Sequence, residues 1–249
     1  MQIQLIRNAT LRMEYAHRRF IIDPYLAAKH TRPSYAGASP NPLVDLPCSP
    51  QEAIAGIEMA LISHLHSDHF DPAAKDLLPK AIPILCQPED QAEIESMGFR
   101  SVIPVGDTIN WQGIMITRTP CQHGAGAVLA EMGDASGFVF EAGNEPTVYW
   151  AGDTIWCEAV AETIHRMQPD VIITHSCGAM WGDHVLIVMD AAQTVAVCRA
   201  ASNSMVIATH MEALDHATVT RAALRKYTEA QGIGSERLLI PLDGERITF

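Results

Sequence analysis

Three histidines and two aspartates lie within eight consecutive positions, residues 64–71. His64 and His66 are two positions apart, so in an extended chain their imidazole rings point to the same side and can hold one metal ion. Asp68 and His69 follow where the chain has begun to turn, and they can face a second ion beside the first. Because imidazole and carboxylate groups suit zinc and related divalent ions, this stretch predicts a metal site. The alternative is a polar loop whose histidines are accidental.

The flanking elements place this stretch at the end of a strand. An apolar run at residues 57–62, interrupted only by Glu58, indicates a buried strand. Asp71 can then cap a helix, and Pro72 suits the first turn of that helix. The histidines would therefore lie on a loop that leaves the carboxyl end of a strand, where layered folds often carry catalytic or binding residues.

In this context the pattern His-x-His-x-Asp-His resembles the signature of the metallo-β-lactamase superfamily. The resemblance implies an α+β fold, a four-layer αββα sandwich with one or two metal ions at its rim. It also implies three more ligands further along the chain. They would be a lone histidine, an aspartate preceded by glycine, and a histidine that follows a strand.

Three residues match these expected positions. His123 stands alone in the glycine-containing loop 119–126, although a loop histidine bonded to backbone is the alternative. Asp153 follows Gly152 at a strand end, and it could instead cap a helix at 155–167. His210 follows the apolar strand 205–209, with His216 as its competitor.

The resemblance assigns these side chains to two ions. It implies that one ion is held by His64, His66 and His123, that the other is held by Asp68, His69 and His210, and that Asp153 bridges them. We expect two zinc ions per chain, with manganese as the alternative. Such a centre binds a shared water, lowers its pKa and yields a hydroxide that attacks carbon or phosphorus. Asp68 is also a candidate base or proton relay.

A second resemblance lies in the loop 175–184. It is similar to the glycine-containing loop that follows a strand in the L-ascorbate-6-phosphate lactonase subgroup, which implies a lactone, ester or phosphodiester of a small anionic molecule. His184 is a candidate proton donor or substrate-binding group, and a surface histidine is an equal alternative. His175 is expected to be a structural, hydrogen-bonded histidine.

Other activities remain open. A phosphodiesterase of the same fold is the runner-up among hydrolases, and a mononuclear iron oxygenase acting on a thiol or persulfide shares the His-x-His-x-Asp-His stretch. A non-catalytic metal-binding protein is a third alternative. His66 replaces the glutamate of flavodiiron proteins, which disfavours a redox di-iron centre. His69 replaces another residue of the best-known β-lactamases, which disfavours antibiotic hydrolysis.

Composition restricts the partners. The chain has 249 residues, 48% of them apolar, so we expect one domain spanning 1–249. Its net charge of −12 disfavours nucleic acid, since no surplus of Lys and Arg exists to displace counterions. The expected partner is a small-molecule substrate, and a homo-oligomer is left open.

Cysteine usage and the first residues bear on location. The six cysteines include no C-x-x-C pair and indicate reduced thiols. The first residues indicate a strand rather than a signal peptide, and no apolar run is long enough to span a membrane. We therefore expect a cytoplasmic protein with no membrane partner.

The remaining pattern predicts short strands and helices around one long irregular segment. Residues 2–22 alternate as three strands, and Asp23 ends the third, where it could support the site from below or simply cap a turn. Residues 26–50 are rich in proline and indicate a lid or contact loop, from which His30 or Tyr35 could reach the metal cleft.

Overall fold

The strands of the computed structural model form two large sheets, and the described residues are 1–182 and 184–249. The first sheet has seven strands in the order β16-β1-β2-β3-β4-β5-β6. Their bounds are β1 Gln2–Arg7, β2 Thr10–Tyr15, β3 Arg18–Ile22, β4 Met59–Ile62, β5 Ile84–Cys86, β6 Val102–Pro104 and β16 Arg246–Thr248. Strands β1, β2 and β3 pair antiparallel, whereas β3 through β6 run parallel.

The second sheet also has seven strands, in the order β15-β14-β11-β10-β9-β8-β7. Their bounds are β7 Thr108–Trp111, β8 Ile114–Pro120, β9 Ser136–Glu141, β10 Val148–Trp150, β11 Val171–His175, β14 Met205–Thr209 and β15 Leu238–Leu239. Strands β10, β11 and β14 are parallel neighbours, and β8 points the same way because β9 between β8 and β10 is antiparallel to both. The carboxyl ends of these four strands therefore meet at one edge.

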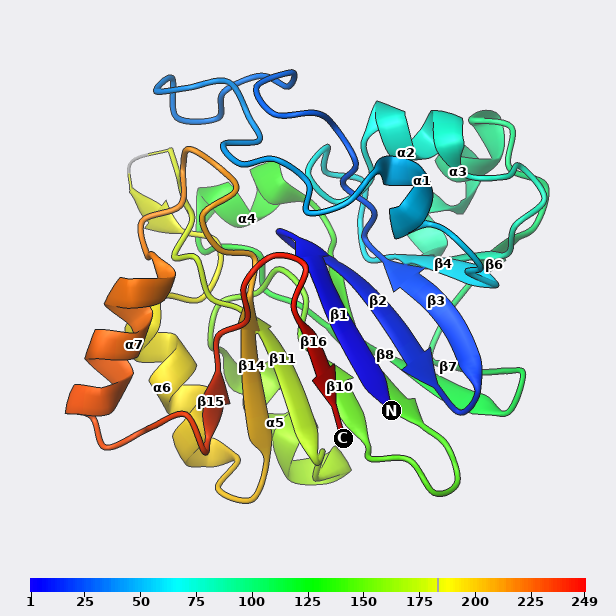
Figure 1. Cartoon of the computed structure of the whole chain (residues 1–249). Coiled ribbons are helices and arrows are strands. Elements are labelled where there is room, and N and C mark those ends of the chain that lie inside the picture. The colour runs from blue at the N-terminus through cyan, green and yellow to red at the C-terminus, as the bar shows by residue number, and fades with distance from the viewer. Residues whose placement is uncertain (183) are drawn as a thin grey trace.

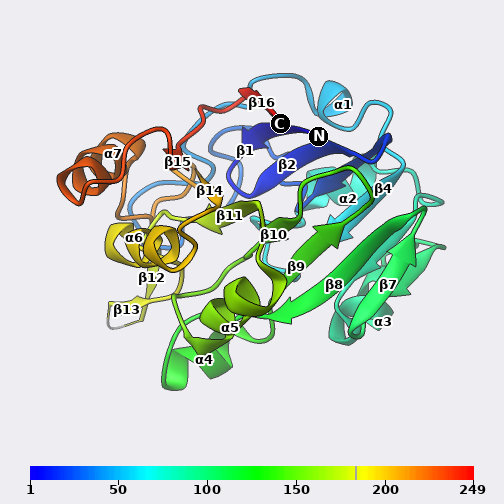
Figure 2. The ribbon, with the colours of Figure 1, turned by 90° about the horizontal axis from the view of Figure 1, so that it is seen from below.

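Helices cover the outer face of each sheet (Figures 1 and 2). The first sheet carries α1 Pro50–Ala53, α2 Pro72–Leu77, the 3-10 helix η1 Pro88–Asp90 and α3 Gln91–Ser96, and the second carries α5 Glu158–Met167, α6 Ala191–Ala200 and α7 Arg221–Ala230. A short helix, α4 Ala127–Met132, and the hairpin of β12 Met180–Trp181 with β13 Val185–Leu186 lie beside the strand ends. The order helix, sheet, sheet, helix confirms the predicted α+β four-layer sandwich.

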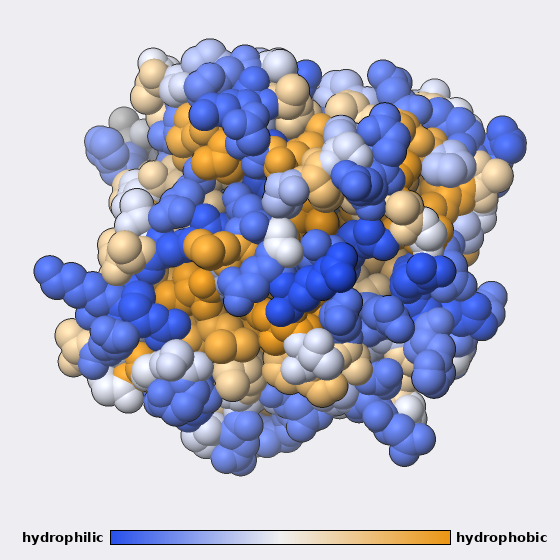
Figure 3. Space-filling view, in the orientation of Figure 1, coloured by the Kyte–Doolittle hydropathy of each residue, from blue (hydrophilic) through white to orange (hydrophobic). Residues whose placement is uncertain are grey.

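Successive side chains of each strand point to opposite faces of its sheet, so the two sheets and their helices enclose three apolar layers. In β11, Val171 and Ile173 face the central core between the sheets, while Ile172 faces α5, α6 and α7. Each sheet is thus apolar on both faces, which explains why the strands read as nearly continuous apolar runs. Figure 3 shows apolar surface over the region where Figure 1 draws β14, β15 and β16. Leu239 of β15 and Ile247 of β16 are partly buried and pack against the central core.

Several local predictions are confirmed, and a few boundaries differ. Asp71 caps α2 through the backbone N–H of Ala74, as predicted, and Ser49 and Glu52 form a capping box at α1. Helix α5 begins at Glu158, not at residue 155, and its N-cap is Cys157, so Asp153 is not a helix cap. Helix α4 was not predicted, because six residues between glycines show too little periodicity.

The proline-rich segment 26–50 is irregular up to α1, as predicted, with one isolated bridge between Arg32 and Asn41. It lies over the edge where the strand ends meet, at the top of Figure 1. Buried Arg7 holds both ends of this segment, since it donates to the backbone carbonyls of Tyr25 and Ala27 at the start and of Val44 near the end. Within the described part of the chain, no helix has both the length and the apolar character needed to cross a membrane.

Candidate metal centre

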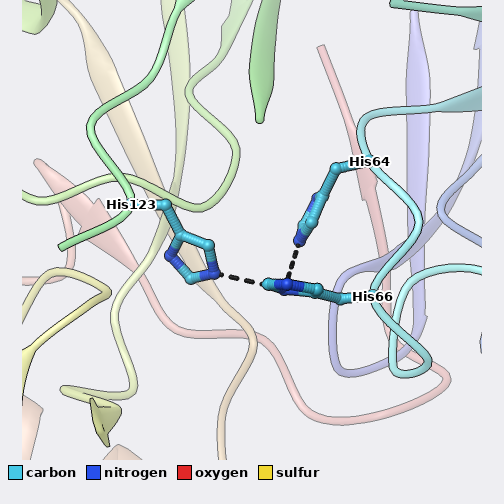
Figure 4. A group of neighbouring side chains, drawn as sticks. All are labelled: His64, His66 and His123. Atoms are coloured by element: carbon cyan, nitrogen blue, oxygen red, sulfur yellow. Dashed lines mark hydrogen bonds between the residues drawn. The ribbon is translucent and has the colours of Figure 1, made fainter. Parts of the chain in front are cut away.

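Three of the predicted ligands converge from two loops (Figure 4). His64 and His66 follow β4, and His123 follows β8. Nδ1 of His66 lies 2.9 Å from Nε2 of His64 and 3.3 Å from Nε2 of His123. We call these residues the three-histidine set. The two rings of His64 and His66 face each other with their centres 4.5 Å apart, in line with the expectation that both point to one side.

The other predicted ligands form a second group, the aspartate–histidine set of Asp68, His69 and His210. Oδ2 of Asp68 lies 3.4 Å from Nε2 of His69 and 3.2 Å from Nε2 of His210, and those two nitrogens are 3.4 Å apart. The turn at residues 67–69 places His69 beside the three-histidine set, with the ring centres of His64 and His69 4.2 Å apart. His210 comes from the end of β14.

Asp153 lies between the two sets. It follows β10, and its Oδ2 is 3.2 Å from Nε2 of His69 and 3.5 Å from Nε2 of His123. One carboxylate oxygen thus faces a member of each set. This is the arrangement that a bridging role requires, and the assignment of that role remains a prediction.

The spacing of these atoms fits metal ligands. A tetrahedral ion with bonds of about 2.0–2.1 Å keeps its ligand atoms roughly 3.3 Å apart. Within the aspartate–histidine set the separations are 3.2–3.4 Å, and within the three-histidine set the two contacts of His66 are 2.9 and 3.3 Å. Both sets belong to groups whose ligand atoms all lie within 4.8 Å of one another. The nitrogen and oxygen donors suit zinc, manganese or iron, so the residues present fit a divalent ion.

In two of these histidines, Nδ1 makes a hydrogen bond on the side of the ring away from the ligand sets. The lone pair is then on Nε2, which faces the other ligands. Asp23 accepts from the backbone N–H and the hydroxyl of Ser63 at 2.8 and 2.7 Å. The Ser63 oxygen can then only accept from Nδ1–H of His64, 2.9 Å away, which leaves the lone pair on Nε2. His123 donates from Nδ1 to the carbonyl oxygen of Ile187 at 2.8 Å, with the same result.

The two sets differ in their electrostatics. Burial lowers the pKa values of His64, His66 and His123, so these rings are neutral and their lone pairs are available near pH 7. Burial also opposes a proton on His69, but the surrounding carboxylates, Asp153 above all, raise its pKa to about 10. The aspartate–histidine set therefore lies in a strongly negative environment, which a divalent cation would neutralise.

Both carboxylates stay ionised despite their burial. Burial alone would raise the pKa values of Asp68 and Asp153, but the neighbouring His69 and His210 hold them well below the usual range. Asp68 is 6% exposed and Asp153 is 3% exposed, so bulk water screens them little. Buried carboxylates of this kind need cationic partners.

Sequence reasoning missed Asn8. Its side-chain nitrogen lies 3.4 Å from Oδ2 of Asp68 and 3.3 Å from Nε2 of His210, and its backbone carbonyl accepts from the N–H of His210 at 2.9 Å. In the sequence Asn8 separates two strands and has the appearance of an ordinary turn residue, so no signal marked it.

His175 is hydrogen-bonded, as predicted, and it lies closer to the centre than expected. Its Nδ1 is 2.5 Å from Oδ1 of Asp153, and it belongs to a third possible ligand group with Asp153 and His210. Burial lowers its pKa to about 4. A neutral His175 can donate from Nδ1 and so hold the orientation of Asp153.

The other candidates belong to none of the ligand groups among the described residues. His184 is exposed in the turn between β12 and β13, next to residue 183, the part of the loop 175–184 that lies outside the described residues. His216 packs its ring edge against Tyr35, with the ring centres 5.0 Å apart. His30 is exposed and lies on the long loop, whereas Tyr35 lies in the site, 2.7 Å from the hydroxyl of Ser67.

A cavity of about 230 Å³ opens directly onto the ligands. Described residues around it come from six segments and include four of the candidate ligands; they are Tyr35, His66, Ser67, Asp68, His123, Glu131, Met132, Asp153, Trp181, Ile187 and His216. A hydrolytic centre of this kind, at the edge of an αββα sandwich, is what the metallo-β-lactamase resemblance implies.

Comparisons with known proteins agree with this class. The sequence profile of the family described as "Beta-lactamase superfamily domain" matches residues 18–211. The UPF0173 protein YddR of Bacillus subtilis strain 168 is 37% identical over 255 aligned residues, covering 100% of both chains.

Two crystal structures are similar over the whole chain. The isothiocyanate hydrolase from Delia radicum gut bacteria superimposes with a TM-score of 0.93 at 34% identity, covering 100% of this chain and 99% of that one. A "possible metal-dependent hydrolase" from Veillonella parvula DSM 2008 has a TM-score of 0.96 at 34% identity, with the same coverage. This chain belongs to the β-lactamase superfamily and is a metal-dependent hydrolase of the metallo-β-lactamase fold.

Proposed function

We propose that this chain binds two divalent ions, zinc or manganese, and hydrolyses a small uncharged molecule at an electrophilic carbon. Esters, lactones and isothiocyanates are the substrate classes that fit. The observation that carries this proposal is the convergence of two three-residue ligand sets on Asp153, at the floor of a cavity of about 230 Å³.

The ions would supply an activated water and would stabilise negative charge that develops on the substrate. The chain's own residues position that chemistry. Asp153 would hold the two ligand sets at a constant separation, and His175 would hold Asp153. Oδ2 of Asp68 contacts His69 and His210, which leaves Oδ1 as the oxygen that can accept a proton from the attacking water.

The lining of the cavity favours an uncharged substrate. Among its described residues none is lysine or arginine, and Glu131 adds negative charge. An anionic phosphate or sugar phosphate has charge that extends beyond the ions and would need cationic side chains there. This argues against the phosphodiesterase alternative and against the anionic lactone implied by the lactonase resemblance. The apolar side chains of Met132, Trp181 and Ile187 suit a carbon skeleton instead.

The isothiocyanate class has one further observation in its favour, the 34% identity to an isothiocyanate hydrolase over the full length of this chain. The reaction balances with water alone. Water oxygen bonds to the central carbon of the N=C=S group and nitrogen takes a proton. The resulting thiocarbamic acid then loses carbonyl sulfide and leaves a primary amine. A small apolar cavity beside a proton acceptor suits both steps.

The decisive experiment combines elemental analysis with a substrate panel on the full-length protein. We expect about two zinc or manganese ions per chain, and hydrolysis of p-nitrophenyl acetate, γ-butyrolactone or methyl isothiocyanate in preference to bis-p-nitrophenyl phosphate. Asp153→Ala should lose hydrolysis and retain less metal, whereas the exposed-site control Asp76→Ala should keep both. Full activity in metal-free protein would contradict the proposal. One iron per chain together with oxygen uptake would instead support the oxygenase.

A further inference from the structure

A second cavity of about 620 Å³ adjoins the cavity at the ligands. We call them the outer and inner cavities. The two share three lining residues, Tyr35, Trp181 and His216, which form the wall between them. Ligand pockets typically measure roughly 300–1,000 Å³, so the inner cavity alone is small for a substrate, and the outer cavity brings the pair into that range.

Hydrogen bonds and a ring contact hold the three wall residues in place. Trp181 donates from its indole nitrogen to Glu131 of α4 at 3.1 Å. Tyr35 has its hydroxyl 2.7 Å from the hydroxyl of Ser67, and its ring meets His216 edge-on. These contacts come from five segments that are distant in sequence, so the wall is a feature of the folded chain.

Asp215 fastens the loop that carries Tyr35. Its carboxylate accepts from the hydroxyl of Ser34 and from the backbone N–H groups of Tyr35 at 2.9 Å, Ala36 at 3.2 Å, Ala38 at 3.2 Å and Ser39 at 3.3 Å. Asn41 adds a reciprocal pair, donating to the carboxylate at 3.1 Å and accepting from the N–H of Asp215 at 2.9 Å. Because these groups satisfy the carboxylate, Asp215 acts as a structural anchor at the rim of the outer cavity.

The lining of the outer cavity indicates what it would hold. Ala36, Met180, Trp181 and Ala217 present apolar groups. The residues with polar side-chain atoms are Tyr35, His184, His216, Thr218 and the satisfied Asp215. No lysine or arginine occurs among the described residues around it. An anionic tail would therefore find no lysine or arginine here, and the Asp215 carboxylate is already satisfied, whereas an alkyl or aryl group would replace water against apolar side chains.

We propose that the outer cavity is the subsite for an uncharged alkyl or aryl tail of the substrate, whose reacting carbon lies in the inner cavity. This inference rests on the proposed function for the position of the reacting carbon. It narrows the substrate to molecules with a small electrophilic head and an apolar tail that passes the wall of Tyr35, Trp181 and His216.

The first test is a chain-length series on the metal-loaded protein. The probes are n-alkyl isothiocyanates from methyl to hexyl and p-nitrophenyl esters from acetate to octanoate. Each methylene that enters an apolar site should raise kcat/KM roughly two- to fourfold, the range expected for its partial to full burial. The gain should stop once the tail fills the outer cavity. A rate that is flat or falling with tail length in both series would overturn the inference.

Variants of the lining locate the effect. Met180→Glu places a charge in the outer cavity, and Ala36→Trp narrows it from the exposed loop. Each should reduce the hexyl-to-methyl ratio of kcat/KM at least tenfold. The matched control is Met115→Glu, which makes the same change at a methionine that is 38% exposed on β8 and lines neither cavity. Its ratio should stay at the wild-type value, and a loss equal to that of Met180→Glu would overturn the inference.

Binding of inert analogues separates this inference from the proposed function. N-hexylurea and N-methylurea offer the same head without a reactive bond, and their affinities can be measured by calorimetry on the wild type and on Ala36→Trp. A stronger affinity for the hexyl compound that Ala36→Trp removes would support the subsite even if no hydrolysis is found. Equal affinities beside active hydrolysis would overturn the subsite and leave the proposed function standing.

Discussion

Oδ2 of Asp23 accepts a hydrogen bond from Nδ1 of His69 over 2.7 Å, and both side chains are fully buried. The same carboxylate holds Ser63, which in turn orients His64. One side chain that contacts neither cavity therefore orients a histidine in each ligand set. Partners of this kind commonly change metal affinity when they are replaced.

We predict that Asp23→Asn weakens metal binding about 10- to 100-fold, because an amide cannot accept from both Ser63 and His69 as the carboxylate does. Competition with a chelator of known affinity measures the change. Asp76→Asn, on the exposed face of α2, should bind metal like the wild type. An Asp23→Asn protein with unaltered affinity for both ions would show that the orientation of these rings does not depend on Asp23.

Removal of the metal should destabilise the fold as well as abolish activity. Asp23, Asp68 and Asp153 lie together in the interior, and without cations their mutual repulsion is compensated only by protonated histidines. An ion present at about 1,000 times its Kd stabilises a protein by roughly 4 kcal/mol. For a chain of this size that corresponds to a fall in Tm of about 8–16 °C on chelation. Calorimetry before and after treatment with EDTA, then with zinc restored, checks this, and an unchanged Tm would contradict it.

Cys177 contacts Nδ1 of His210, just as Asp23 contacts Nδ1 of His69. Its Sγ lies 3.4 Å from Nδ1 of His210, and the thiol is completely buried. Cys177→Ala would leave a buried N–H without a partner, which costs roughly 1–3 kcal/mol. We expect about a tenfold loss of affinity for one of the two ions, seen by titration of metal-depleted protein. Cys177→Ser retains an acceptor and should recover most of that loss; if Ser and Ala behave alike, the hydrogen bond has no role.

Asp215 should make stability depend on pH in the acid range. Partial burial opposes its ionisation, but the donors from Ser34, the loop N–H groups and Asn41 outweigh it and hold its pKa below the usual range. A carboxylate whose pKa is lowered in the folded state stabilises the fold above its unfolded pKa, near 3.9, and loses that contribution as the pH falls through the folded value.

Asp215→Asn should therefore be less stable than the wild type by about 1–2 kcal/mol at neutral pH, and the difference should shrink below about pH 4. Urea unfolding at several pH values measures it. Asp107→Asn, an exposed carboxylate near β7, is the matched control and should show little difference at any pH. A difference for Asp215→Asn that is equal at pH 7 and pH 3 would exclude a role for its charge.

Much of the fold could be predicted from the sequence because its signals are local. Apolar runs marked the central strands at 57–62 and 205–209, and Asp71 marked a helix start through side-chain capping. Strand β14 was predicted at its observed bounds, Met205–Thr209. Helix α4 and the hairpin of β12 with β13 were missed, since such short elements depend on neighbours such as Ile187 rather than on their own periodicity.

The sequence by itself indicated which side chains could bind metal, because the spacing of His64 and His66 follows from the period of the backbone and the metallo-β-lactamase resemblance implies Asp153 and His210. Only the tertiary structure decided which residues support those ligands. Asn8 and Cys177, which no sequence signal marked, and Asp23, which the sequence left open between a support and a turn cap, reach the centre from segments far apart in the chain. Tyr35 reaches it because Asp215 anchors its loop. Such contacts depend on how the two sheets pack, and local spacing carries no record of that packing.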